Sequence, residues 1–299
     1  MIIRQVISHQ SLLAWWSRLG ITAIVIAIFF TFDLYRLGIA DAQTSQTEIT
    51  GKVISGTRDA DVPANTEVLL LAIDLVNNQI IEEASTLTNE NGIFQFKNVV
   101  HKPGVNFRVV ANSGTHTPSV DMQLVENWQD VELTIYEETG SLEQIIIDSY
   151  VLMIPTINAR ERQAGVLSVI NLSNTGDRVW TPDLKNPNLT GLDLLRFNLP
   201  LGYTNLSVES ELPPGNILDI ATGFAMTNPI PPGDATILIS YIVPYEGDGF
   251  DFILKLPYGA TQIRMLLADE AGFISSDNLD ATEPVTVADS LFNAIQGRD

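Results

Sequence analysis

Short runs in which apolar and polar residues alternate recur along most of this chain, and turn residues separate them. A period of two places successive side chains on opposite faces of an extended strand, so each run can present one apolar face to a core. Runs of this length and spacing are typical of all-β sandwiches. The first set covers residues 48–54, 67–73, 79–85, 93–96, 106–112, 119–124 and 131–136.

An Asn-Gly pair marks one of the turns between these runs. Asn91 and Gly92 stand just before the run 93–96. Asn-Gly is the strongest short turn signal, because both residues tolerate a positive φ. Phe94 and Phe96 are two residues apart, so we expect them to share one face of the strand and to point into the core.

The region 46–138 also resembles a known family, the carboxypeptidase regulatory-like domain. This resemblance implies a transthyretin-like, seven-stranded sandwich, a module found outside cells and appended to enzymes, receptors and adhesins. It does not imply peptidase activity in this region. The residues that carry it are Gly51-x-Val53, Val62-Pro63 followed by Val68-x-Leu70, and Thr88 to Gly92 followed by Phe94-x-Phe96-x-Asn98-Val99.

A second set of apolar runs predicts a second sandwich at residues 142–272. Residues 142–155 are strongly apolar and β-branched, which favours a strand through a buried sheet. Most prolines fall between the runs, where they suit loops and strand ends. The later runs are 165–172, 192–197, 206–209, 217–221, 236–243, 250–256 and 260–267, and the prolines are Pro182, Pro187, Pro200, Pro213, Pro214, Pro229, Pro231 and Pro232.

Part of this second region resembles uncharacterised bacterial envelope proteins. The likeness lies in a proline-rich turn and the strand after it, at residues 229–234, 239–241 and 244–245. It implies a location in the cell envelope and no particular chemistry.

The first 42 residues have the features of an export segment. Arg4 and Arg18 precede an uncharged apolar stretch at 21–32, and Ala40-Asp41-Ala42 follows it. Positive residues, an apolar core and small residues before the cut define a secretory signal, with cleavage expected after Ala42. Aromatic residues at 15–16 and at 35 flank the stretch, as in an uncleaved membrane anchor. In both alternatives the rest of the chain is extracytoplasmic, secreted or anchored to the outer face of the cytoplasmic membrane.

The predicted organisation is therefore all-β, with two tandem β-sandwich domains after an N-terminal apolar helix. Residues 1–42 form the signal peptide or membrane anchor, 46–138 the first sandwich and 142–272 the second. Residues 273–299 read as an acidic tail with a short amphipathic helix, because Val287, Leu291, Phe292 and Ile295 recur at helical spacing.

Composition narrows the function. The chain has no cysteine, so its domains must be held by their cores without disulfides, and thiolate chemistry is excluded. Its formal net charge of −20 repels nucleic acid and anionic lipid. Solubility in an exposed environment explains such a charge, and calcium or a cationic partner is the alternative.

We find no catalytic constellation and predict a protein that is not an enzyme and holds no cofactor. The sequence lacks a Gly-x-Ser-x-Gly elbow, a His-Glu-x-x-His motif and a phosphate loop. Residues 246–251 could bind calcium through three carboxylates, although an acidic turn explains them as well, so the metal stays unknown. His101 and His116 are expected to be surface histidines in loops, with a metal pair as the alternative.

Two functions remain. The first is a non-catalytic structural or protein-interaction component of a membrane-associated envelope assembly, with exposed edge strands as its contact surface. The alternative is a carbohydrate-binding module, which would need exposed aromatic rings, although large rings in sandwiches are more often core. The available rings are Trp128, Trp180, Tyr203, Tyr241, Tyr245 and Tyr258.

Overall fold

The structure is a computed structural model, and it describes residues 46–297 except 62, 63, 101, 115, 123–127, 186–193, 221, 248 and 250. The predicted apolar helix and the signal peptide or anchor at 1–42 lie outside the described residues. Within the described residues, no helix is long and apolar enough to cross a membrane.

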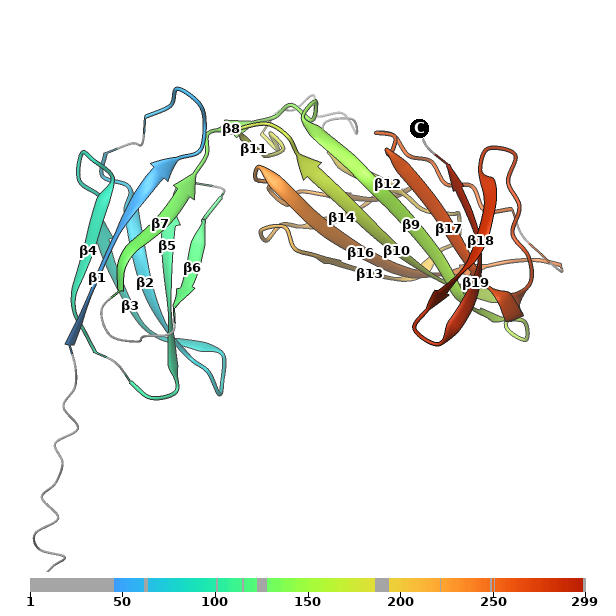
Figure 1. Ribbon diagram of the computed structural model, residues 1–299, viewed down its shortest axis with the longest axis horizontal. Coiled ribbons are helices and arrows are strands. Elements are labelled where there is room, and N and C mark those ends of the chain that lie inside the picture. Colours follow the sequence, from blue (N-terminus) through green and yellow to red (C-terminus); the bar gives the residue numbers. More distant parts are fainter. Residues whose placement is uncertain are drawn as a thin grey trace, which may run out of the picture. The chain divides into compact units, whose positions relative to one another are not determined.

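The all-β prediction is confirmed, and the first seven strands form one sandwich (Figure 1). A three-stranded sheet in the order β4-β1-β7 faces a four-stranded sheet in the order β3-β2-β5-β6. Within the first sheet β1 pairs with β7 in parallel, whereas every other pair is antiparallel. The strands are β1 (Gln46–Ser55), β2 (Glu67–Asp74), β3 (Gln79–Leu87), β4 (Ile93–Val100), β5 (Val105–Asn112), β6 (Ser119–Met122) and β7 (Trp128–Ile135).

Alternate residues of these strands form the first core. Phe94 and Phe96 are both buried, as expected, and their rings meet edge to face with centroids 6.1 Å apart. Gly51 lies against them, because a Cβ at this position would overlap the Phe94 ring and the Val131 carbonyl. Burying a side chain of this size contributes roughly 1.5–3 kcal/mol. The glycine in the sequence motif therefore allows the Phe94 ring to fill the core.

The Asn-Gly turn does not close a hairpin between paired strands. It carries the chain from β3, in one sheet, to β4, in the other. Gly92 has a φ of 75°, and the Asn89 side chain accepts hydrogen bonds from the Asn91 and Ile93 amides at 2.9 and 3.0 Å. The turn signal is therefore correct, and the structure decides which strands it joins.

The remaining long strands form a second, unequal sandwich. A seven-stranded sheet in the order β13-β16-β10-β9-β17-β19-β18 packs against a three-stranded sheet in the order β12-β15-β14. Its strands are β9 (Ile145–Asn158), β10 (Gln163–Asn174), β12 (Leu195–Asn198), β13 (Thr204–Ser210), β14 (Ile217–Ile220), β15 (Gly223–Met226), β16 (Gly233–Pro244), β17 (Gln262–Ala268), β18 (Asp280–Val287) and β19 (Ser290–Gly297).

Trp180 is a fully buried member of the second core. Its indole Nε1 donates to the Gly140 carbonyl oxygen at 3.2 Å. Trp180 lies in β11 (Val179–Trp180), a two-residue strand that pairs in parallel with β8 (Glu138–Thr139). Its backbone also exchanges hydrogen bonds with Ile230. The segment that follows the first sandwich is thereby fixed to the core of the second.

Residues 250–256 are not the strand that their alternation predicts. Phe252, Leu254 and Leu256 are half-buried against the second core, and Ile253 between them is exposed. The described part of this segment, however, joins no sheet. Alternation of apolar and polar residues shows which side chains are covered, but it does not show that the backbone pairs. This segment covers the core without belonging to a sheet.

The predicted helix in the tail is also wrong. Residues 280–297 form the β18–β19 hairpin, which completes the seven-stranded sheet, and the one short helical turn nearby is Asp269–Ala271. The helical spacing is misleading because β19 is apolar on both faces. Ile295 enters the main core, whereas Phe292 and Ala294 pack with Leu266 on the opposite face of the sheet.

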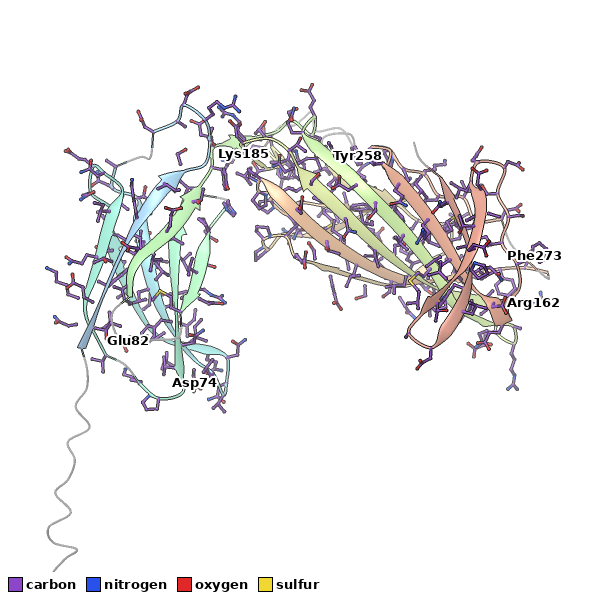
Figure 2. The ribbon with its side chains drawn as sticks, in the orientation of Figure 1. Asp74, Glu82, Arg162, Lys185, Tyr258 and Phe273 are labelled. Carbon is purple, nitrogen blue, oxygen red and sulfur yellow. The ribbon has the colours of Figure 1, made fainter. Side chains whose placement is uncertain are left out.

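We expect Trp180→Ala to destabilise the second sandwich by roughly 3–5 kcal/mol, because it empties a fully buried site. Trp180→Phe should destabilise the sandwich less, since it keeps an aromatic ring in the buried site, although it loses the hydrogen bond to Gly140. Hydrogen exchange of the β9 and β10 amides measures this free energy for the second sandwich alone. Phe273→Ala is the control, because Phe273 is 88% exposed (Figure 2). Equal effects of Trp180→Ala and Phe273→Ala would contradict this view of the core.

Candidate interaction surface

Strand β3 is an edge strand that extends beyond the core of the first sandwich. Among the described strands it pairs only with β2. All of its residues are exposed except Thr86, which is half-buried. In β2, by contrast, Val68, Leu70 and Ala72 are buried in alternation. The outer edge and both faces of β3 are therefore open to solvent.

Apolar side chains gather on the hairpin that joins β2 to β3. Leu75, Val76, Ile80 and Ile81 are 61, 87, 59 and 51% exposed. The ladder shifts register between Ala72 and Ile73, so that Ile81 has no residue opposite it and bulges from the strand. Exposed apolar residues that gather in this way mark contact sites more often than isolated ones do.

The hairpin itself is well defined by hydrogen bonds. Asp74 accepts bonds from the Val76 amide at 2.8 Å and the Asn77 side chain at 2.9 Å, and these bonds lower the pKa of the Asp74 carboxyl. Asn78 closes the turn with a φ of 51°, which asparagine tolerates. The position of Ile80 and Ile81 is therefore built into the fold. Figure 2 labels Asp74 and Glu82 on this hairpin.

Charge on β3 is negative. Glu82 pairs with Lys102 at 2.7 Å, and both side chains are about half exposed or more, so the pair adds little stability. Glu83 forms no ion pair within the described part of the chain. Edge strands usually carry lysine or proline, which prevent pairing with other chains, and β3 has neither.

The predicted metal ligands do not form a site in the described residues. Those residues contain no group of three or more histidine or acidic side chains that could hold a metal ion. His101 lies outside them, as do Asp248 and Phe250 of the calcium candidate at 246–251. His116 is described, and its prediction as a surface histidine is wrong, because it is 9% exposed and its Nδ1 has no hydrogen-bond partner.

The rings named for carbohydrate binding are largely used for packing. Trp180 and Tyr241 are buried in the second core, and Tyr203 packs edge to face on Tyr241 with centroids 6.5 Å apart. Tyr258 donates to the Leu194 carbonyl and accepts from the Arg196 amide. Tyr245 is half-buried, and the Trp128 side chain is not among those described. Trp180, Tyr241 and Tyr203 therefore cannot stack on a sugar without disrupting the core.

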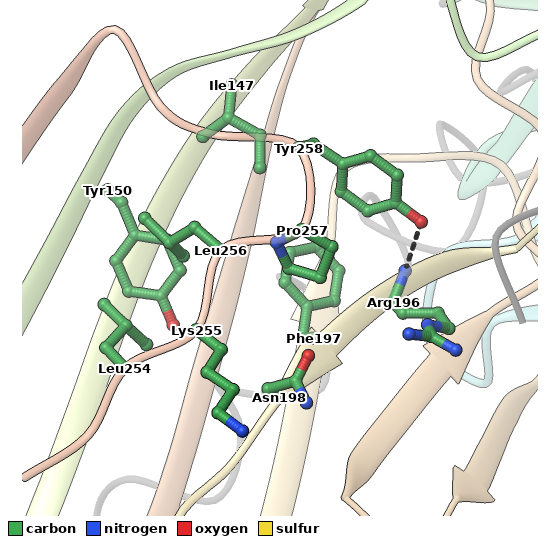
Figure 3. A pocket seen from close by; sticks show the side chains of 10 residues that line it. All are labelled: Ile147, Tyr150, Arg196, Phe197, Asn198, Leu254, Lys255, Leu256, Pro257 and Tyr258. Carbon is green, nitrogen blue, oxygen red and sulfur yellow. Dashed lines mark hydrogen bonds between the residues drawn. The ribbon is translucent and has the colours of Figure 1, made fainter. Parts of the chain in front are cut away.

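A crevice beside Tyr258 is a packing seam (Figure 3). It lies between β12, with Arg196 to Asn198, and the unpaired segment 254–258, and Ile147 and Tyr150 form its floor. It has no room for a molecule the size of water. Burial raises the pKa of the Tyr150 hydroxyl, so this group does not ionise at neutral pH. The crevice offers neither space nor an active base.

The sequence held one signal for the exposed edge. Residues 79–85 are counted among the alternating runs, yet their order Ile80-Ile81-Glu82-Glu83 is not a strict alternation of apolar and polar residues. If β3 had one buried face, one of its two adjacent glutamates would point into the core. This departure from alternation coincides with the bulge at Ile81 and with the absence of a buried face on β3.

Comparison with known proteins identifies no family for this chain. No protein-family model matches it, and no curated protein matches it. The resemblance to the carboxypeptidase regulatory-like domain therefore stays a prediction, while the sandwich architecture that it implied is present.

Solved structures give only distant likenesses. An M1 zinc metallopeptidase from Deinococcus radiodurans is 13% identical over 52% of this chain and 39% of its own, with a TM-score of 0.31. A DUF3823 family protein from Parabacteroides merdae is 10% identical over 68% of this chain and 82% of its own, with a TM-score of 0.24. The major pilin SpaD from Corynebacterium diphtheriae is 12% identical over 73% of this chain and 59% of its own, with a TM-score of 0.23. The chain spans about two fifths of the peptidase, and at these scores the likenesses carry no argument about function.

Buried His116 should make stability depend on pH. Burial lowers its pKa from the ordinary 6.5, so the unfolded chain takes up the proton first as the pH falls. We therefore expect the free energy of unfolding to decrease from pH 6.5 downward, and His116→Leu to remove part of this decrease. Urea unfolding of the full chain at pH 7.5, 6.5 and 5.5 measures it. Asp74→Asn is the control, because the pKa of Asp74 is lowered and lies below this pH range. If the free energy of unfolding depends on pH equally in His116→Leu and in the parent, His116 is not the group responsible.

Proposed function

We propose that this protein is a non-catalytic, extracytoplasmic component of an envelope assembly, and that it binds a partner protein through the edge of β3. The observation that supports this most directly is the nine-residue edge strand with both faces exposed. The export-type segment at 1–42 supports the location, and the acidic composition favours a basic partner.

Strand addition is the binding mode that fits this edge. An extended segment of the partner would pair its backbone with β3, and apolar side chains of that segment would cover Ile80 and Ile81. The edge offers unpaired amides and carbonyls without rearrangement. The unfavourable part of the binding free energy therefore comes mainly from the conformational freedom that the partner segment loses.

The charge on β3 favours a different protein over a second copy of this chain. Antiparallel pairing of two β3 strands about their middle would bring Glu82 and Glu83 of both copies together, and like charges across a ladder are destabilising. A partner segment with lysine or arginine near Glu83 gains an ion pair in the same position. The preferred occupant is therefore an extended apolar segment that carries basic residues.

Hydrogen exchange on the native complex tests this proposal. The full chain is isolated from membranes in nonionic detergent with its partner, and exchange is compared with that of the chain alone. The β3 amides should exchange at least about tenfold more slowly in the complex, the effect of about 1.4 kcal/mol. Strand β13, an edge strand of the second sandwich, is the matched control and should not change.

Two variants complete the test. Ile80→Lys with Ile81→Lys should abolish the complex, because it removes the apolar surface and repels basic residues. Leu201→Lys, at a position 93% exposed on the second sandwich, should leave it intact. Protection of β13 rather than β3, or equal loss of the complex in both variants, would overturn the proposal.

A further inference from the structure

The seven-stranded sheet has an outer face, opposite the second core, whose middle is apolar. Alternate side chains of β9, β10 and β16 enter the core, and those between them point to the outer face. When one face of a sheet is packed, the other is normally polar because it meets water. Here its central residues are apolar, and they are half-buried except for Leu238, which is 38% exposed. They are Leu167 and Val169 of β10, Val151 and Met153 of β9, and Leu238 of β16.

The sheet register joins these residues into one patch. Val169 lies opposite Leu238 on one side and opposite Val151 on the other, and Leu167 lies opposite Met153. Leu167, Val169 and Leu238 belong to none of the buried clusters in the described part of the chain, so internal packing does not explain them. Contiguous apolar patches on a surface mark contact sites more often than scattered apolar residues do.

One row of residues across this face has a carboxylate at one end and an arginine four strands away. Each member of the row lies opposite the next on the adjacent strand, in the strand order of Figure 1. The row runs from Glu209 of β13 through Leu238, Val169 and Val151 to Arg264 of β17. Neighbouring strands are about 4.8 Å apart, so about 19 Å separates Glu209 from Arg264 in one chain. The two charges therefore cannot pair within the same molecule.

Arg264 lacks a counter-charge. Its Nη2 donates to the Gln296 side chain at 3.0 Å, which holds the guanidinium between β17 and β19. Its Nε is buried and has no hydrogen-bond partner among the described residues. Neither Arg264 nor Glu209 takes part in an ion pair there. A buried arginine nitrogen is normally hydrogen-bonded, so this Nε indicates an acceptor from outside this part of the chain.

From these observations we propose that the outer face of the second sandwich binds the same face of a second copy of this chain. The two copies are related by a twofold axis that lies between the sheets and runs along β10. This axis places Val169 against Val169 of the second copy, Leu238 against its Val151, and Glu209 against its Arg264. Sheets packed face to face lie about 10 Å apart with their strands nearly aligned, a gap that glutamate and arginine side chains bridge together.

The face is self-complementary, as a twofold interface requires. Apolar residues of each copy cover those of the other, and the pair Glu209–Arg264 forms twice, once on each side of the axis. The footprint spans five strands and residues 163–171 of β10, about 24 Å by about 30 Å, or roughly 700 Å² on each copy. This is close to the area of about 800 Å² per partner that stable complexes bury. It leaves out Asp148 and Asp234, which would repel their equivalents.

Sedimentation equilibrium of the full chain tests the proposal. The chain is kept in density-matched nonionic detergent at physiological ionic strength, where salt screens the general repulsion between two acidic copies. The parent should form a dimer. Arg264→Glu and Glu209→Arg each place like charges at both ends of the row, so each should raise the dissociation constant of the dimer at least about tenfold. A monomeric parent, or a dissociation constant that neither variant changes, would overturn the proposal.

A mixture of the two variants separates a lost interface from a lost fold. In a heterodimer of Arg264→Glu with Glu209→Arg, each carboxylate of one chain again faces an arginine of the other. The mixture should therefore associate with about the affinity of the parent, and so should the double variant, in which both charges are exchanged. A misfolded variant would not regain binding in this way. Failure of both the mixture and the double variant to associate would refute the pairing of Glu209 with Arg264.

Val169→Lys tests the apolar middle of the interface. It brings two lysines together at the axis and should prevent the dimer. Phe273→Lys is the matched control, because Phe273 is 88% exposed and lies in no strand, and it should leave the dimer intact. A dimer retained by Val169→Lys, or lost equally in both variants, would contradict the interface. Since β3 is untouched in every one of these variants, failure here and failure of the proposed strand addition can be told apart.

Discussion

The burial of alternate side chains of β9 and β10 in one apolar cluster is the interaction on which the second sandwich depends. These two strands pair along most of their length, and their inward side chains belong to one buried cluster that also includes Trp180. Without cysteine no disulfide can share this task, so apolar burial must hold the strands in register. Once β9 and β10 are fixed, β17 pairs with the outer edge of β9 and β16 with the outer edge of β10.

The first sandwich shows the same principle with a different outcome at one edge. Strand β2 places Val68 and Leu70 in the core, whereas β3 next to it buries almost nothing. Among the described strands β3 pairs only with β2, and this leaves an edge with Ile80 and Ile81 open to contact. Such an exposed edge is an aggregation hazard. The two glutamates on the strand limit the hazard by making self-pairing unfavourable.

How much could be predicted depends on whether a pattern is local. Phe94 and Phe96 share a face because strand geometry alone decides it, and both are buried as predicted. The segment 250–256 keeps the alternation of a strand, yet pairing needs a neighbour that no local pattern reveals. In β19 the apolar residues follow helical spacing because both faces of the strand are covered, by two different clusters. Both wrong predictions have the same cause. Contacts with segments far away in the sequence decide which residues are buried, so the spacing of apolar residues can imitate a strand or a helix that does not form.

The sequence by itself determined that the part of the chain described by the structure is all-β, that its cores must hold without disulfides, and that the protein is acidic, since these follow from side-chain alternation and composition. It also located most of the strands. Only the tertiary structure decided that β3 is an open edge, that His116 is buried, and that residues 280–297 form a hairpin. The physical reason is that edges, burial and convergent side chains are properties of strand pairing between segments far apart in the chain. Periodicity shows which face of a strand is apolar, but it does not show which strand lies beside it.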